Sequence, residues 1–260
     1  MKRLFLSVLL LLLAACSDGG DPAPEPRTVT FPIASAHTGQ TYDITVSLPV
    51  GYDKTATRSP VIYALDGTDR LTRLAEPLRR QKYDNVIMVG ISANGGGRRF
   101  IDFTMPGAEA YNRFVTAELI PKIDAEYHTD PAMRVLTGHS LSAEFALFSL
   151  FMEPVASRTF RAYVVNDCSC WIDSTGAFVP DWTVPIQMLE GLYARNPVLP
   201  VKVWMGSSNG MLPPAIYQRL SMRGFQGLEA RHTPFPQDTA GMDAASFAES
   251  LVFSLGPPQP

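Results

Sequence analysis

The stretch from Met133 to Leu150, MRVLTGHSLSAEFALFSL, decides the fold. An apolar strand at residues 133–137 is followed almost at once by an apolar helix at residues 141–152, with Gly-His-Ser-Leu-Ser at residues 138–142 between them. A tight turn from a strand into a helix strains the backbone of its central residue, so small residues are needed two positions before and two positions after it. Gly138 and Ser142 meet that need.

Ser140, at the centre of this turn, is the candidate nucleophile. It would stand at the amino terminus of the helix, where the helix dipole and the first N–H groups favour a developing negative charge. The N–H of Leu141 is then a natural donor to an oxyanion. The same pattern also fits a turn serine without chemistry. His139 is not expected to be the base for its neighbour, because adjacent residues at such a turn point apart.

Outward from this motif, short apolar runs alternate with amphipathic stretches, which predicts a mostly parallel sheet flanked by helices in one α/β domain. Residues 60–66 (PVIYALD) and 85–92 (NVIMVGIS) are nearly continuous apolar strands, as expected where both faces of a sheet are covered. The alternation in residues 41–48 predicts an antiparallel pair with residues 28–36. The other expected elements are helices at 70–81, 108–128, 213–223 and 243–255, strands at 161–166, 200–205 and 228–235, and a loop at 94–103.

The composition is that of an ordinary globular protein. The chain has 260 residues, of which 46% are hydrophobic and 18% charged, with a net charge of -3. There is no basic stripe, so we expect no nucleic-acid partner. Three cysteines are too few for a disulfide scaffold.

The first 27 residues are expected to lie outside the domain. Residues 4–15 form an apolar run behind Lys2 and Arg3, which has the size of a signal-peptide core and is short for a membrane span. The run ends in Leu-Ala-Ala-Cys, which resembles a bacterial lipobox, in which Cys16 becomes the acylated amino terminus. An ordinary secretory signal or a buried helix are the alternatives.

These features divide the chain into a lipoprotein signal peptide (1–15), a flexible tether (16–27), the α/β domain (28–256) and a tail (257–260). The tether is rich in Pro, Gly and acidic residues, which cannot pack a core. Ser17 stands where an inner-membrane retention signal would have Asp. We therefore expect a lipid anchor in the bacterial cell envelope, at the outer membrane and facing the periplasm.

Over residues 40–255 the chain resembles the family of α/β-hydrolase-fold esterases that includes the enterochelin (siderophore) esterases. The order and spacing of several segments carry the resemblance. They are residues 61–67 (VIYALDG), 86–91 (VIMVGI), 99–104 (RFIDFT), 118–123 (ELIPKI), 137–141 (TGHSL) and the run from Arg161 through Trp171.

The resemblance implies a serine ester hydrolase that needs no cofactor and no metal. Such an enzyme combines a nucleophile, a base that takes its proton, often an acid that orients the base, and donors for the oxyanion. Ser140 matches the nucleophile. Gly67, in the turn Asp66-Gly67, matches the position whose backbone helps to form the oxyanion hole, although a plain turn is the alternative reading.

The base is where this sequence departs from the family. The family places its histidine after the last strand, and the matching stretch here is residues 235–243, FPQDTAGMD, with Ala240 in the histidine position. Alanine cannot accept a proton. His232 is the nearest histidine in sequence and a weak candidate base, because it lies eight residues earlier within the predicted strand. His37 and His128 have no motif around them.

The acid is also in doubt, because the turn after residues 201–205 reads GSSNG, without a carboxylate. Glu144 needs a hydrogen-bond partner if it is buried, and is otherwise a conceivable pocket acid. Cys168 and Cys170 could form a strained disulfide, bind a metal or stay unpaired. Trp171 and Trp182 could belong to a lid or to the core.

Two hypotheses for function follow. In the first, the protein hydrolyses small-molecule esters, siderophore-like ones among them, through Ser140. In the second, it is a catalytically degenerate relative that binds a ligand or an envelope partner in the retained pocket. Ala240 favours the second hypothesis, whereas Ser140 and the family resemblance favour the first.

Overall fold

The computed structural model describes residues 26–55, 57–168, 183–208 and 215–258. Eight strands form one sheet in the order β1-β2-β4-β3-β5-β6-β7-β8. β1 and β2 are antiparallel to each other, β2 is antiparallel to β4, and the remaining pairs are parallel. The strands are β1 (Thr28–Ala34), β2 (Thr41–Ser47), β3 (Ser59–Leu65), β4 (Ile87–Ile91), β5 (Thr129–His139), β6 (Ala162–Asn166), β7 (Lys202–Ser207) and β8 (Glu229–Pro234).

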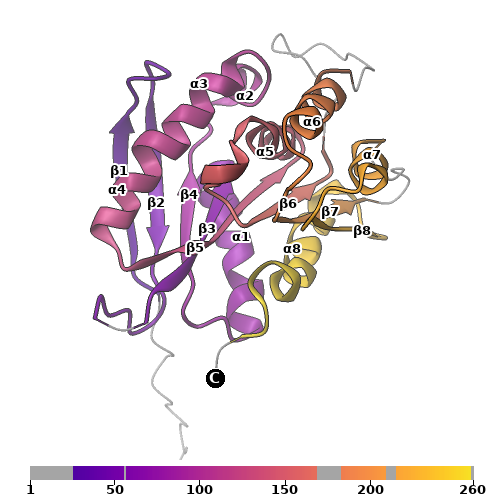
Figure 1. The fold of residues 1–260 in the computed structure, drawn as a ribbon. Coiled ribbons are helices and arrows are strands. Elements are labelled where there is room, and N and C mark those ends of the chain that lie inside the picture. The colour runs from indigo at the N-terminus through magenta and orange to yellow at the C-terminus, as the bar shows by residue number, and fades with distance from the viewer. Residues whose placement is uncertain (1–25, 56, 169–182, 209–214, 259–260) are drawn as a thin grey trace, which may run out of the picture.

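Helices cover both faces of the sheet, as Figure 1 shows. α1 (Gly67–Arg80) and α8 (Thr239–Leu255) pack together on one face. The other face is covered by α3 (Gly107–Arg113), α4 (Ile120–Glu126), α5 (Leu141–Met152), α6 (Thr183–Arg195) and α7 (Ala215–Arg223), and α2 (Gly96–Asp102) contacts α3 and α5. The mostly parallel sheet flanked by helices is therefore confirmed.

The strand β3 shows how the sequence builds these layers. Tyr63 and Leu65 point into the cluster under α3–α7, whereas Ile62 and Ala64 point into the cluster under α1 and α8. Side chains of a strand alternate between its two faces. All four are fully buried, which explains the uninterrupted apolar run.

Two regions differ from the sequence-based expectation. The predicted loop at 94–103 contains the short helix α2. Gly95, the N-cap of this helix, has a φ of 83°, which glycine adopts without steric strain. The predicted helix at 108–128 is three pieces, because a π-helical segment, Phe114–Leu119, precedes Pro121. Proline has no N–H to donate within a helix, which favours such an irregularity.

The last helix begins earlier than predicted. α8 starts at Thr239 rather than at Asp243, and its N-cap is Asp238, whose Oδ1 accepts a hydrogen bond of 2.8 Å from the Gly241 N–H. An aspartate at the N-cap satisfies an N–H that has no acceptor within the helix. Ala240 is consequently in the first turn of a capped helix. Among the described residues, no helix is long and apolar enough to cross a membrane.

Candidate active site

The predicted turn around Ser140 is present between β5 and α5. Ser140 has a φ of 59° and a ψ of -120°, which is a strained conformation for a residue with a side chain. Its N–H donates a 2.9 Å hydrogen bond to the carbonyl of Asn166 in β6. A Cβ atom on Gly138 would lie 2.2 Å from the carbonyl oxygen of Ser142, so only glycine fits at that position. The backbone therefore has the geometry of a nucleophile elbow.

Ser142 ties the elbow to the neighbouring turn. Its hydroxyl accepts a 2.8 Å hydrogen bond from the His139 N–H and donates one to the Asp66 carboxylate. The other oxygen of that carboxylate binds Arg99 Nε at 2.7 Å. A serine in place of the usual glycine thus adds a bond between the elbow and the turn that leaves β3.

The two backbone positions predicted for the oxyanion hole lie at the carboxyl ends of adjacent strands. Leu141 is the first residue of α5, and Gly67 is the first residue of α1. β3 and β5 are paired, with Ala64 opposite Thr137, so both turns leave the sheet side by side. The first N–H groups of a helix have no acceptor within it, which suits both positions for an anion.

The structure does not bring His232 to Ser140. His232 lies in β8, and the sheet register places it level with the elbow but three strands from β5. Three spacings of about 4.8 Å amount to about 14 Å. Its Nε2 is 2.9 Å from Ser207 Oγ, its ring is 5.4 Å from that of Tyr217, and burial lowers its pKa.

The other histidines are not placed as bases either. His139 Nε2 lies 3.0 Å from the carbonyl oxygen of Thr239, to which it donates, and so holds the start of α8 against the elbow. His128 directly precedes β5, at the amino end of the strand that carries Ser140 at its carboxyl end. His37 lies in the exposed turn between β1 and β2. The four histidines thus lie at other places in the fold, and Ala240 is the residue at the family's histidine position.

A buried ion pair lies beneath the elbow, on the α1 and α8 face. Arg70 and Asp243 are 1% and 4% exposed in their side chains and are joined by two hydrogen bonds of 2.8 and 2.9 Å. Arg70 also donates to Thr137 in β5, and Asp243 accepts from Asn166 in β6. Burial alone would raise the pKa of Asp243, but Arg70, with smaller contributions from His139 and Asn166, holds it below its usual value.

The acidic residues at the start of α8 have different roles. The helix expected to begin at residue 243 begins at Thr239 with Asp238 as its cap, and Asp243 is the buried partner of Arg70. The turn after β7 has no carboxylate at Ser207 or Ser208. A carboxylate does stand at the end of β6, where Asp167 is 7% exposed. The signal for it was an acid directly after a buried parallel strand, in RAYVVND.

Glu144 is buried one helical turn after Ser140. It is 4% exposed, and its Oε2 has no hydrogen-bond partner among the described residues. Burial raises the pKa of this carboxyl to about 9. Glu144 therefore carries its proton at neutral pH, within an apolar helix.

Glu144→Gln is expected to become more stable relative to wild type as the pH rises. An unfolded chain releases the Glu144 proton above about pH 4.5, whereas the folded chain keeps it to about pH 9, so the wild-type free energy of unfolding falls across this range. The difference should grow by up to about 1.4 kcal/mol per pH unit. Urea unfolding at pH 5, 6.5 and 8, with exposed Glu249→Gln as the control, measures it. A difference that does not change with pH would show that Glu144 is ionised in the folded state.

Of the three cysteines, the structure describes Cys168. Cys168 is disulfide-bonded, and the other two cysteines, Cys16 and Cys170, lie outside the described residues, as do Trp171 and Trp182. No group of His, Cys, Asp or Glu side chains suited to a metal ion occurs in the described part of the chain.

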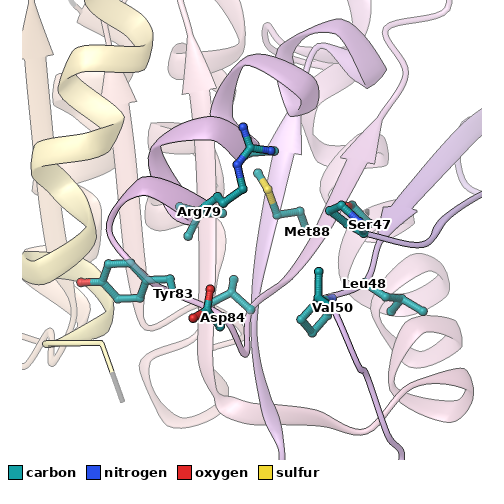
Figure 2. A pocket seen from close by; sticks show the side chains of 12 residues that line it. Ser47, Leu48, Val50, Arg79, Tyr83, Asp84 and Met88 are labelled. Carbon is teal, nitrogen blue, oxygen red and sulfur yellow. The ribbon is translucent and has the colours of Figure 1, made fainter. Parts of the chain in front are cut away.

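Figure 2 shows residues that line a cavity of about 620 Å³. Met88, near the start of β4, and Arg79, in the last turn of α1, line it together with residues that follow β2, such as Val50. Ser140 stands at the carboxyl end of β5, so this cavity is separate from the elbow. We assign no part of the chemistry to it.

Comparisons with known proteins show which proteins this chain resembles. The family model described as "Putative esterase" matches residues 35–212. Ferri-bacillibactin esterase BesA of Bacillus subtilis is 30% identical over 173 residues, which cover 53% of this chain and 57% of that protein. The chain thus matches little more than half the length of this curated relative.

Solved structures share the fold. An IroE-like serine hydrolase from Shewanella oneidensis has a TM-score of 0.70 at 22% identity, over 86% of this chain and 78% of that one. The siderophore hydrolase EstA from Aspergillus nidulans has a TM-score of 0.72 at 15% identity, over 97% and 98%. At these identities the structures show the α/β-hydrolase fold alone.

Proposed function

We propose that this chain, which belongs to the esterase family of the α/β-hydrolase fold, hydrolyses carboxylic esters with Ser140 as the nucleophile. The observation that carries the proposal is the backbone of the elbow. Ser140 has the left-handed φ of 59°, and Gly138 is packed so closely against Ser142 that no side chain fits. Backbone strain of this kind persists only where the surrounding structure imposes it, and it is typical of catalytic positions.

In the proposed reaction, Ser140 Oγ attacks the carbonyl carbon of the ester and its proton passes to a base. The carbonyl electron pair moves onto oxygen, where backbone N–H groups at Leu141 and Gly67 stabilise the oxyanion. Collapse of this intermediate expels the alcohol and leaves an acyl group on Ser140. Water then hydrolyses the acyl-enzyme by the same steps in reverse order.

We infer a siderophore-type ester as the substrate. BesA is named as an esterase of ferri-bacillibactin, and EstA as a siderophore hydrolase. These two names support a substrate that is a small-molecule ester with iron-binding groups, in preference to a simple acyl ester. No cofactor enters the proposed reaction.

A second candidate function is favoured by Ala240. Without a histidine at this position, the protein could retain the family pocket and bind its ligand without turnover. In that case the chain would act as an envelope protein that binds a ligand or a partner.

The two candidates separate in one experiment. Wild type and Ser140→Ala are each incubated with a catecholate trilactone and with 4-nitrophenyl butyrate, and products and binding are followed. Turnover of the trilactone by wild type and not by Ser140→Ala supports hydrolysis. Equal binding of the trilactone by both proteins, with no product from either, would establish the binding function instead.

We also propose that the protein is a lipoprotein of the bacterial cell envelope. The support is the lipobox-like sequence before Cys16 and the tether that follows it, both of which lie outside the described residues apart from the last tether residues. Detergent partitioning of expressed wild type and Cys16→Ser tests this proposal. Wild type is expected in the detergent phase and Cys16→Ser in the aqueous phase, and identical partitioning would refute lipidation at Cys16.

A further inference from the structure

Asp167 and Ser140 leave adjacent strands at the same level of the sheet. β5 and β6 are parallel, with His139 opposite Asn166, and the next residues along the two strands are Ser140 and Asp167. The Ser140 N–H binds the Asn166 carbonyl, and the Asp167 N–H donates a 2.9 Å bond to the Gly206 carbonyl. Asp167 has a φ of 45°, so strained non-glycine backbone occurs at both positions.

The Asp167 carboxylate is buried, and among the described residues only one of its two oxygens accepts a hydrogen bond. It is 7% exposed, and its Oδ1 accepts a 2.7 Å hydrogen bond from the Ser208 N–H. Its Oδ2 is buried without a hydrogen-bond partner among the residues that the structure describes. A buried carboxylate oxygen without a donor is unfavourable, so such a group points to an ordered water or to a reacting group.

The Asp167 carboxylate is linked through one residue to the start of α8, the segment in which the family places its base. The Ser208 N–H that holds Asp167 belongs to the residue whose Oγ lies 3.5 Å from Thr239 Oγ1. Thr239 directly precedes Ala240. Asp167 therefore stands close to the start of α8, in a segment of the sequence that has no histidine in this chain.

Other carboxyl groups around the elbow are not available for this role. Asp66 is bound by Ser142 and Arg99, and Asp243 by Arg70 and Asn166. Glu144 also has an oxygen without a partner, but its raised pKa keeps it protonated at neutral pH. Of these groups, Asp167 alone combines an unpartnered oxygen with a position beside Ser140.

We propose that Asp167 is the general base of this hydrolase and accepts the Ser140 proton through one bridging water. The proposal rests on the esterase function inferred above. Ser140 Oγ gives its proton to the water as it bonds to the acyl carbon, and the water passes a proton to Asp167 Oδ2. When the C–O bond to the alcohol breaks, the proton returns by the same route to the leaving alkoxide. A second water then attacks the acyl group, and its proton takes the same path before returning to Ser140 Oγ.

The rate of covalent labelling by a fluorophosphonate tests the assignment, because this reagent requires an activated serine. Asp167→Asn keeps an oxygen for the Ser208 N–H but cannot accept a proton, and we expect its labelling rate to fall about 10²- to 10⁴-fold. Asp167→Ala should be equally slow and should regain rate in formate, which can occupy the vacated space. Asp84→Asn, at the far end of the sheet, is the control and should label like wild type.

Formate rescue is the result that a purely structural role would not produce, since it requires a folded site that lacks only a carboxylate. Asp167→Asn labelling within threefold of wild type, or Asp167→Ala without formate rescue, would overturn the assignment of the base. Failure of the esterase function itself is distinguishable. In that case wild type shows neither labelling nor ester turnover, and the assignment of a base falls with it.

Discussion

Replacing Asp243 by alanine is expected to lower the free energy of unfolding by about 3–5 kcal/mol, the loss that follows when one partner of a buried ion pair is removed. The variant leaves the Arg70 guanidinium 1% exposed and without its counter-charge. Asn166 also loses the carboxylate to which its side chain donates at 2.9 Å. For a domain of this size, such a change lowers the Tm by roughly 10 °C.

Chemical denaturation of wild type and Asp243→Ala at neutral pH measures the effect. Asp238→Ala is the matched control, because it removes an exposed aspartate from the start of the same helix and should cost only about 1 kcal/mol as a lost N-cap. The pair Arg70→Met with Asp243→Leu should recover much of the loss, because no buried charge remains unpaired. Equal destabilisation by Asp243→Ala and Asp238→Ala would contradict the structural role of the ion pair.

The contribution of the Arg70–Asp243 ion pair to stability decreases at low pH. The pKa of Asp243 is lower in the folded protein than its ordinary value of 3.8, because Arg70, together with His139 and Asn166, stabilises the carboxylate more than burial destabilises it. Stability from this group is therefore present at neutral pH and is lost as the pH falls through the acidic range. Glu144 has the opposite effect, since its raised pKa reduces stability as the pH rises.

The central part of the fold could be predicted from the sequence because its signals are local. The strand, the elbow and the helix around Ser140 lie within 24 consecutive residues, and the apolar strands β3 and β4 are each recognisable alone. The requirement for a small residue at position 138 follows from the turn itself. In the structure, the carbonyl oxygen of Ser142 leaves no room for a Cβ atom at this position.

The parts that could not be predicted depend on contacts between distant segments. Arg70 and Asp243 are 173 residues apart, and nothing in either local sequence indicates the other. The early start of α8 depends on the Asp238 cap, which is compatible with a turn as well as with a helix. The burial and bonding of Asp167 could not be predicted either, because its carboxylate is held by the Ser208 N–H, 41 residues further along the chain.

Ser140→Ala is expected to eliminate covalent reaction with a fluorophosphonate altogether. The reagent bonds to the oxygen of an activated serine, and alanine has no such oxygen. Ser142 is the closest matched control, because it lies two residues away, is fully buried and has its hydroxyl bonded to Asp66. Ser142→Gly restores the usual small residue of the elbow and keeps Ser140, so this variant should still react, although without the bond to Asp66 the turn is less firmly held.

The most direct test of Ser140 as the nucleophile is the intact mass of the wild-type protein after incubation with the fluorophosphonate, followed by peptide mapping. We expect a single adduct on the peptide that contains Ser140, and no adduct on Ser140→Ala treated in the same way. An unmodified wild-type mass, or an adduct that persists in Ser140→Ala, would contradict the assignment.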